Sequence, residues 1–299
     1  MEKKILTGLR SQAYEHPFDR QALVSLEQMP GVSLLFKKIN EYSIDRLYRF
    51  SCTSNNLRVN NRNFPEIHWA FLEACKILEI EPVPELYLMH GTGFIRIWTV
   101  GVKDPIVIIN IDGIKQLTTE ELVFAFGHEL GHIKSRHLLY HQIAFILPAL
   151  GKVIANSTLG IGGLVTNGIE LALYQWVIMA KLTSDRAGLL ACQDKDVAIT
   201  ALIKLGGLLR EYLNPTVIEE FIEQAYDFNS YNLDNIDKIT KAFSFMENMR
   251  PWTVLRASEL LKWIDSGEYL ALIEGKNLKV TEGVGEWGFL DSWETQTGS

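Results

Sequence analysis

The spacing of the hydrophobic residues changes twice along this 299-residue chain, and this change limits its fold more than any other feature. Three short runs rich in β-branched and aromatic residues, at 85–89, 94–100 and 106–111, stand between long segments with helical spacing. Gly91 and Gly93 supply a turn between the first two runs. The pattern predicts a small three-stranded sheet within a mainly helical α+β fold.

Helices are predicted on both sides of this sheet. Before it, residues 31–49 and 65–80 carry helical spacing, and the second segment begins with a proline that suits a first helical turn. After it, Thr118 and Glu121 match a capping box at the start of a long helix. A helical bundle should follow, with helices over 169–192, 196–209, 216–226, 233–249 and 253–264.

The composition is that of a globular protein with a large core, since 47% of residues are hydrophobic and 22% charged. We expect one domain over 1–275 and a Gly-rich, loosely ordered tail over 276–299. A net charge of −7 argues against a nucleic-acid partner. The sequence begins with no secretory signal, and its three cysteines form no recognisable disulfide pattern, so we expect a cytoplasmic protein.

An apolar stretch from Ile143 to Ala180 raises the question of membrane contact. Only Lys152 and Glu170 are charged in it, and its longest charge-free part, 153–169, is shorter than the ~20 residues that a spanning helix needs. We expect buried helices or a helical hairpin here. A hairpin lying on a membrane surface is the alternative.

The chemistry-bearing motif is H-E-x-x-H at 128–132. His128 and His132 are four residues apart on a predicted helix, so both imidazoles lie on one face and can bind one Zn²⁺. Glu129 would lie beside a metal-bound water and act as the general base. Gly127 and Gly131 are small at positions where another helix can pack closely.

A second pair of histidines, His137 and His141, follows the motif. The two residues are also four apart and lie on the same predicted helix, about 140° around its axis from the first pair. We therefore expect surface or hydrogen-bonded histidines that do not share the metal. The remaining histidines have no partner pattern and are interpreted as ordinary ones: His16, His68 and His90.

Two segments resemble a known family. G-H-E-L-G-H-I-K-S-x-H at 127–137 and L-T-S-D-R-A-G-L-L at 182–190 are similar to the HtpX-like and CaaX-prenyl-protease-like zinc metallopeptidases, the gluzincins of metallopeptidase family forty-eight. Shorter similarities extend the resemblance to about residue 275. It implies a zincin-like catalytic domain, one zinc ion per chain, and a protein or peptide substrate.

The resemblance also implies roles for single residues. His128 and His132 would be two zinc ligands, and a glutamate from a later helix the third. Asp185 would steady a ligand histidine. The position of the third ligand, however, is Lys181 in this chain, and an ammonium group does not bind a cation. Asp185 could act as a substitute ligand only if its helix shifted, and Glu170 is three helical turns away.

Two further positions depart from the family pattern. Arg250 stands where relatives often have a histidine that helps to stabilise the oxyanion, so Arg250 or Arg256 would take that role here. Arg96 and Trp98 lie on the predicted edge strand, where relatives carry a small Asn-Ala pair and the substrate backbone adds as a further strand.

Three hypotheses follow. The first is a zinc metalloendopeptidase that hydrolyses peptide bonds with a zinc-activated water. The second is a pseudopeptidase that binds or scaffolds a protein partner, because the three departures fall on the ligand, oxyanion and substrate-edge positions. The third is a membrane quality-control factor that contacts lipid through Ile143–Ala180.

Overall fold

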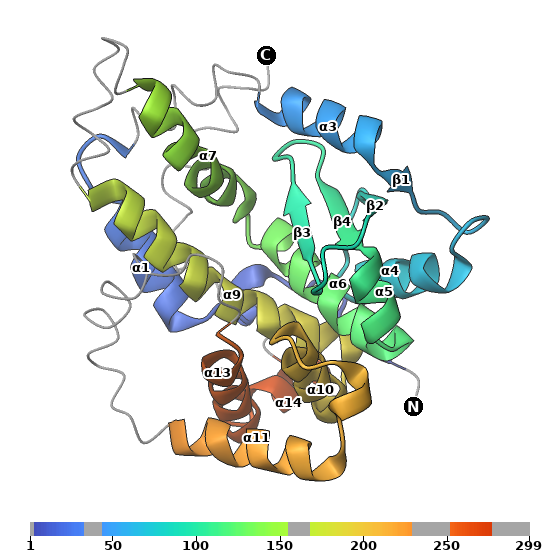
Figure 1. Cartoon of the computed structure of the whole chain (residues 1–299). Helices are drawn as coiled ribbons and strands as arrows, with labels where there is room; N and C mark the ends of the chain where they lie inside the picture. Colours follow the sequence, from blue (N-terminus) through green and yellow to red (C-terminus); the bar gives the residue numbers. More distant parts are fainter. Residues whose placement is uncertain (1–2, 33–43, 155–167, 229–251, 277–299) are drawn as a thin grey trace.

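The computed structural model describes residues 3–32, 44–154, 168–228 and 252–276, and it confirms a mainly helical α+β fold with one small sheet (Figure 1). The N-terminal half contains α1 (Pro17–Glu27), α3 (Ile44–Asn55), β1 (Leu57–Arg58), α4 (Pro65–Ile77), β2 (Glu85–Met89), β3 (Ile97–Val100), β4 (Ile106–Asn110) and α5 (Ile111–Gln116). Next come α6 (Thr119–Lys134), α7 (Leu138–Ile154), α9 (Glu170–Cys192), α10 (Lys195–Leu205), α11 (Pro215–Phe228), α13 (Thr253–Asp265) and α14 (Glu268–Ile273). Short 3-10 turns lie at Ser11–Ala13 and Arg210–Tyr212.

The sheet has four strands rather than the three predicted, in the order β1-β2-β4-β3. The additional strand, β1, pairs antiparallel with β2. It is only two residues long, which is too short to produce a recognisable period. β2 and β4 run parallel, and β3 pairs antiparallel with β4 at the other edge.

The second predicted strand, which is β3 in the structure, begins later than expected, at Ile97 instead of residue 94. The preceding segment is held by side chains rather than by the sheet. The Asn110 amide donates to the Phe94 carbonyl at 2.7 Å, and the Asp112 carboxylate accepts from the Thr92 amide at 2.6 Å. Arg96 therefore lies just before β3, and Trp98 lies within it.

The most extensive helix–helix contact joins α6 and α9, which cross at the centre of the molecule (Figure 1). Glycines bring the two backbones together. A Cβ on Gly127 would lie 2.5 Å from Ala191 Cβ, and one on Gly131 would lie 2.7 Å from Ala187 Cβ. The expectation of close packing at these two glycines is confirmed.

The other helices surround this pair. α4 packs against α6, while α1 and α7 pack against α9. α10, α11, α13 and α14 lie together beyond the C-terminal part of α9 (Figure 1). The predicted helix at 233–249, most of that at 31–49, and the tail after 276 lie outside the described residues, so the division at 275 stays a prediction.

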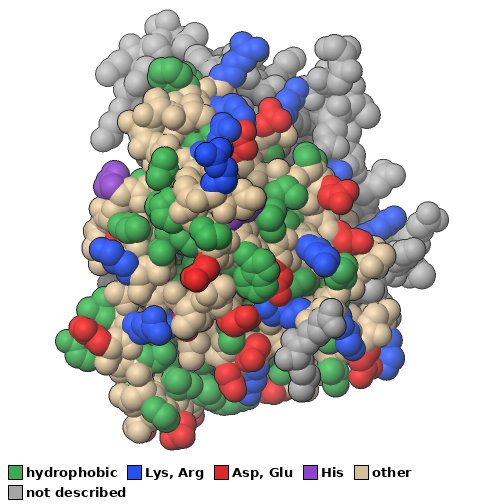
Figure 2. All heavy atoms as spheres, turned by 90° about the vertical axis from the view of Figure 1, so that its right-hand side faces the viewer, with side chains coloured by type: hydrophobic (Ala, Val, Ile, Leu, Met, Phe, Trp, Pro, Cys, Tyr) green, Lys and Arg blue, Asp and Glu red, His purple; other side chains and the backbone are tan. Residues whose placement is uncertain are grey.

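The apolar stretch Ile143–Ala180 is described only in part, as α7 and α9. Among the helices that the structure describes, none combines the length and hydropathy that crossing a membrane requires. The face of the molecule in Figure 2 mixes acidic, basic and hydrophobic side chains in its described part, with no broad basic patch there.

The α6–α9 contact gives a testable prediction. Gly131→Ala should lower the free energy of unfolding by about 1–3 kcal/mol, because the added methyl group overlaps the Ala187 side chain. Denaturant unfolding measures this loss. The double variant Gly131→Ala/Ala187→Gly should lose less than the sum of the two single changes. Strict additivity would contradict the close contact.

Candidate functional site

The N-terminal end of α6 is fixed by the predicted capping box. The Glu121 carboxylate accepts from the Thr118 amide at 2.7 Å, and the Thr118 hydroxyl accepts from the Glu121 amide at 3.3 Å. Lys204 of α10 adds a buried ion pair to Glu121 at 2.6 Å. The helix therefore starts at a defined residue, and the rotation of His128 and His132 about its axis is defined with it.

His128 is oriented by α9 and α13. Its Nδ1 lies 2.8 Å from Asp185 Oδ1, and Arg256 donates hydrogen bonds to both oxygens of that carboxylate at 2.6 and 2.7 Å. Burial alone would raise the pKa of Asp185, but the Arg256 guanidinium outweighs it and lowers this pKa to about 2. Because Nδ1 is engaged, Nε2 of His128 is the ring nitrogen left for a ligand.

His132 is oriented by a different chain of contacts. Its Nδ1 lies 3.0 Å from Nδ1 of His137, and the other ring nitrogen of His137 lies 3.1 Å from Asp19 of α1. Thr183 donates to the same Asp19 oxygen at 2.5 Å. Burial and the neighbouring imidazoles hold the pKa of His132 well below its usual value, so the ring is neutral at pH 7.

Sequence analysis did not identify Asp19, which lies more than 100 residues before the motif. It also misplaced His137 and His141. They are not on the motif helix, because α6 ends at Lys134 and Arg136 adopts a left-handed φ of +56° before α7 begins. This turn brings His141 back beside His132, with ring centroids 4.4 Å apart. Nε2 of His141 is buried and has no hydrogen-bond partner among the described residues.

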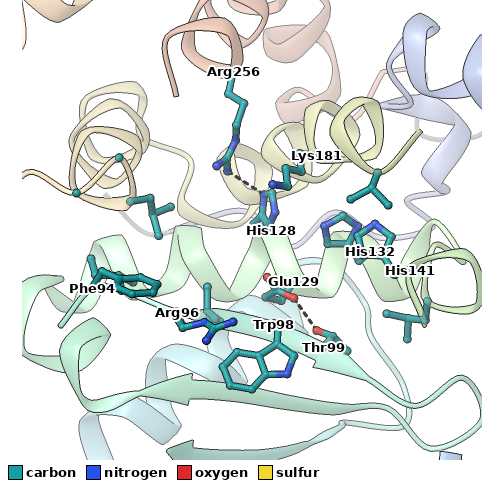
Figure 3. Close-up of a pocket in the computed structure, with 17 residues that line it drawn as sticks. Phe94, Arg96, Trp98, Thr99, His128, Glu129, His132, His141, Lys181 and Arg256 are labelled. Atoms are coloured by element: carbon teal, nitrogen blue, oxygen red, sulfur yellow. Dashed lines mark hydrogen bonds between the residues drawn. The ribbon is translucent and has the colours of Figure 1, made fainter. Parts of the chain in front are cut away.

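Glu129 faces the sheet instead of the other helices. One carboxylate oxygen accepts from the Thr99 hydroxyl of β3 at 2.8 Å (Figure 3). Burial raises the pKa of Glu129, and the nearby His128, Thr99 and Lys181 partly offset this. Thr99 is a second residue that sequence analysis missed, because a single threonine on a strand carries no motif.

Lys181 lies one helical turn before Asp185 on α9, and it reaches toward His128 (Figure 3). Among the described residues it has no hydrogen-bond or ion-pair partner, although it lies in the fields of Asp185 and Glu129. Burial, together with the positive charge of Arg256, lowers its pKa to about 8.

A cavity of about 480 Å³ lies between α6, α9 and the edge strand β3 (Figure 3), and its lining includes His128, Glu129, His132, His141 and Lys181. Its strand wall runs from Phe94 to Thr99. The Arg96 guanidinium lies 5.7 Å from the Phe94 ring and 5.5 Å from the Trp98 ring, so three alternate residues form one stack at this wall. Arg256 also lines the cavity, whereas Arg250 lies outside the described residues.

The donor set does not complete a three-ligand zinc site. In the part of the chain that the structure describes, no three His, Cys, Asp or Glu side chains surround a common point. Lys181 faces the motif histidines where the resemblance calls for a glutamate. The charges of Lys181 and Arg256 already balance those of Glu129 and Asp185, so a dication would leave this buried group of residues with a net charge of about +2.

Stability measurements test the unpaired state of Lys181. The pKa of about 8 in the folded protein lies below the usual lysine pKa of 10.5, so the folded chain binds fewer protons than the unfolded chain between these values and its stability should rise with pH there. Lys181→Met should abolish this rise and increase the free energy of unfolding at pH 7 by about 1–3 kcal/mol. Lys76→Met, at an exposed position of α4, is the control. A less stable Lys181→Met variant would contradict the assignment.

Comparison with known proteins identifies the family. A model of Peptidase family M48 matches residues 62–264, more than half of the chain. The plastoglobule-localized metallopeptidase 48 of Arabidopsis thaliana is 29% identical over 293 residues, which cover 93% of this chain and 79% of the relative. No solved structure gives a significant match. The chain belongs to peptidase family M48.

Proposed function

We propose that this chain is a catalytically impaired member of the M48 family that binds a segment of a protein or peptide in its cleft. The observation that carries the proposal is Lys181, a cation that lines the cavity without a partner among the described residues, where the resemblance implies the third metal ligand. The retained cleft supports binding, and the charge balance of the site disfavours a dication.

The edge strand gives the cleft a means of holding an extended chain. β3 pairs with β4 on one side only in the described sheet, and residues 94–99 form one wall of the cavity. A peptide can add to such an edge through main-chain hydrogen bonds. Arg96 and Trp98 would then contact the side chains of the bound segment.

Zinc-dependent hydrolysis of peptide bonds is the second candidate function. It is favoured by the intact motif, because both histidines keep a partner that orients them. In this candidate His128 and His132 are the metal ligands, Glu129 is the general base, and Arg256 or Arg250 faces the oxyanion. His141, with its unpartnered Nε2, is better placed than Asp185 to be the substitute ligand, since Arg256 already holds both oxygens of Asp185.

The location of the protein stays a prediction from sequence. We propose a cytoplasmic protein, with association to a membrane surface through Ile143–Ala180 as a further element of the proposal. The name of the Arabidopsis relative places that protein at plastoglobules. Flotation of the purified protein with liposomes tests the membrane element.

A cleavage assay tests the impairment. An unfolded protein such as reduced casein is incubated with wild type, Lys181→Glu and Lys181→Glu/Glu129→Gln, each with added zinc. We expect no cleavage by wild type above the double variant, and at least tenfold faster cleavage by Lys181→Glu, which regains a carboxylate ligand.

Two results would count against this proposal. Zinc-dependent cleavage by wild type that Glu129→Gln abolishes would establish the second candidate instead. A Lys181→Glu variant that binds zinc but does not cleave would show that Lys181 is not the cause of the impairment.

A further inference from the structure

We infer that the cleft recognises a carboxylate group of the bound segment, and that Lys181 is the residue that receives it. This inference rests on the proposed binding of a protein or peptide and names the chemistry that the cleft selects. The carboxylate can be the C-terminus of a peptide or the side chain of an aspartate or glutamate.

The first observation is the lack of a partner for Lys181. The charged groups nearest to Lys181 each have a polar contact of their own. Asp185 binds Arg256 and His128, and Glu129 accepts a hydrogen bond from Thr99. Lys181 has neither a hydrogen bond nor an ion pair in the described residues. Lys181 is half-buried, so it has lost part of its hydration without gaining a partner, and a ligand with the opposite charge would offset that cost.

The second observation is the charge of the cavity wall. Three cationic residues line it, and Glu129 is the only carboxylate among the described lining residues. Two of the cations are already engaged, since Arg256 is held by Asp185 and Arg96 stacks between two aromatic rings. The chain as a whole carries −7, so this positive wall is a local exception. Lys181 is therefore the cation of this wall that no described group engages, and such a cation in a cleft attracts a ligand of the opposite charge.

The third observation is the position of Lys181 relative to the edge strand. Lys181 enters the cavity from α9, opposite the wall formed by residues 94–99 (Figure 3). A segment held along β3 would therefore expose its end or a side chain to the Lys181 ammonium. Gly206 and Gly207 border the same cavity.

A binding experiment with defined peptides tests this inference. The probe is a mixture of decapeptides with blocked N-termini and otherwise uncharged side chains. It is prepared in three forms: with a free C-terminal carboxylate, with a C-terminal amide, and with a C-terminal amide plus one internal glutamate. Mass spectrometry measures what the immobilised full-length protein retains. We expect at least one carboxylate form to bind about tenfold or more tightly than the plain amide, and added salt to reduce this preference. The form that is retained identifies the source of the carboxylate.

Variants assign the effect to Lys181. Lys181→Met should abolish the preference, Lys181→Arg should keep it, and Lys76→Met, far from the cleft, should leave it unchanged. Thermal unfolding of each variant checks that it is folded. Equal retention of all three peptide forms by wild type would overturn this inference but leave peptide binding intact. Retention of no peptide would overturn the proposed function as well.

Discussion

The close approach of α6 and α9 is the contact on which the rest of the site depends. Glycines on both helices allow the backbones to pack where a methyl group would overlap. One face of α6 then lies against α9, so Asp185 of α9 contacts His128. Thr183 of α9 donates a hydrogen bond to Asp19, the carboxylate behind the His137–His132 contact. Lys181 lies on the same helix, one turn away. A wider separation would remove these contacts together.

The site keeps the supporting contacts of its motif histidines, while Lys181 stands where the resemblance implies a carboxylate. Each motif histidine is held through Nδ1, His128 by a carboxylate and His132 by a second histidine backed by Asp19. This arrangement leaves Nε2 of each ring available to a ligand. A lysine in place of a carboxylate changes the local charge by two units in the direction that repels a metal ion. The proposed function explains both features: the histidine contacts are kept, and the positive charge of Lys181 opposes a metal ion, so the cleft would bind a peptide without hydrolysing it.

Much of the fold was predictable from local signals. The capping box at Thr118, the strands predicted at 85–89 and 106–111, and the glycines at 127 and 131 each depend on a few neighbouring residues. The structure agrees with them, except that the last strand ends one residue earlier, at Asn110. β1 was missed because two residues carry no period.

The parts of the site that were missed depend on tertiary contacts. Asp19 and Thr99 come from α1 and β3, far from the motif in sequence, and carry no pattern of their own. The position of His141 depends on the left-handed residue Arg136, which ends α6 and redirects the chain. No residue type at that position announces such a turn, so a continuous helix was the natural prediction and was wrong.

Zinc stoichiometry tests the central claim, that Lys181 takes the place of the third ligand and the site does not hold a metal. The wild-type protein would be purified without chelators or a metal-affinity tag, incubated with equimolar zinc, desalted, and analysed for metal beside His128→Ala. The account predicts far less than one zinc per chain in both proteins. One zinc per wild-type chain that is lost in His128→Ala would contradict it.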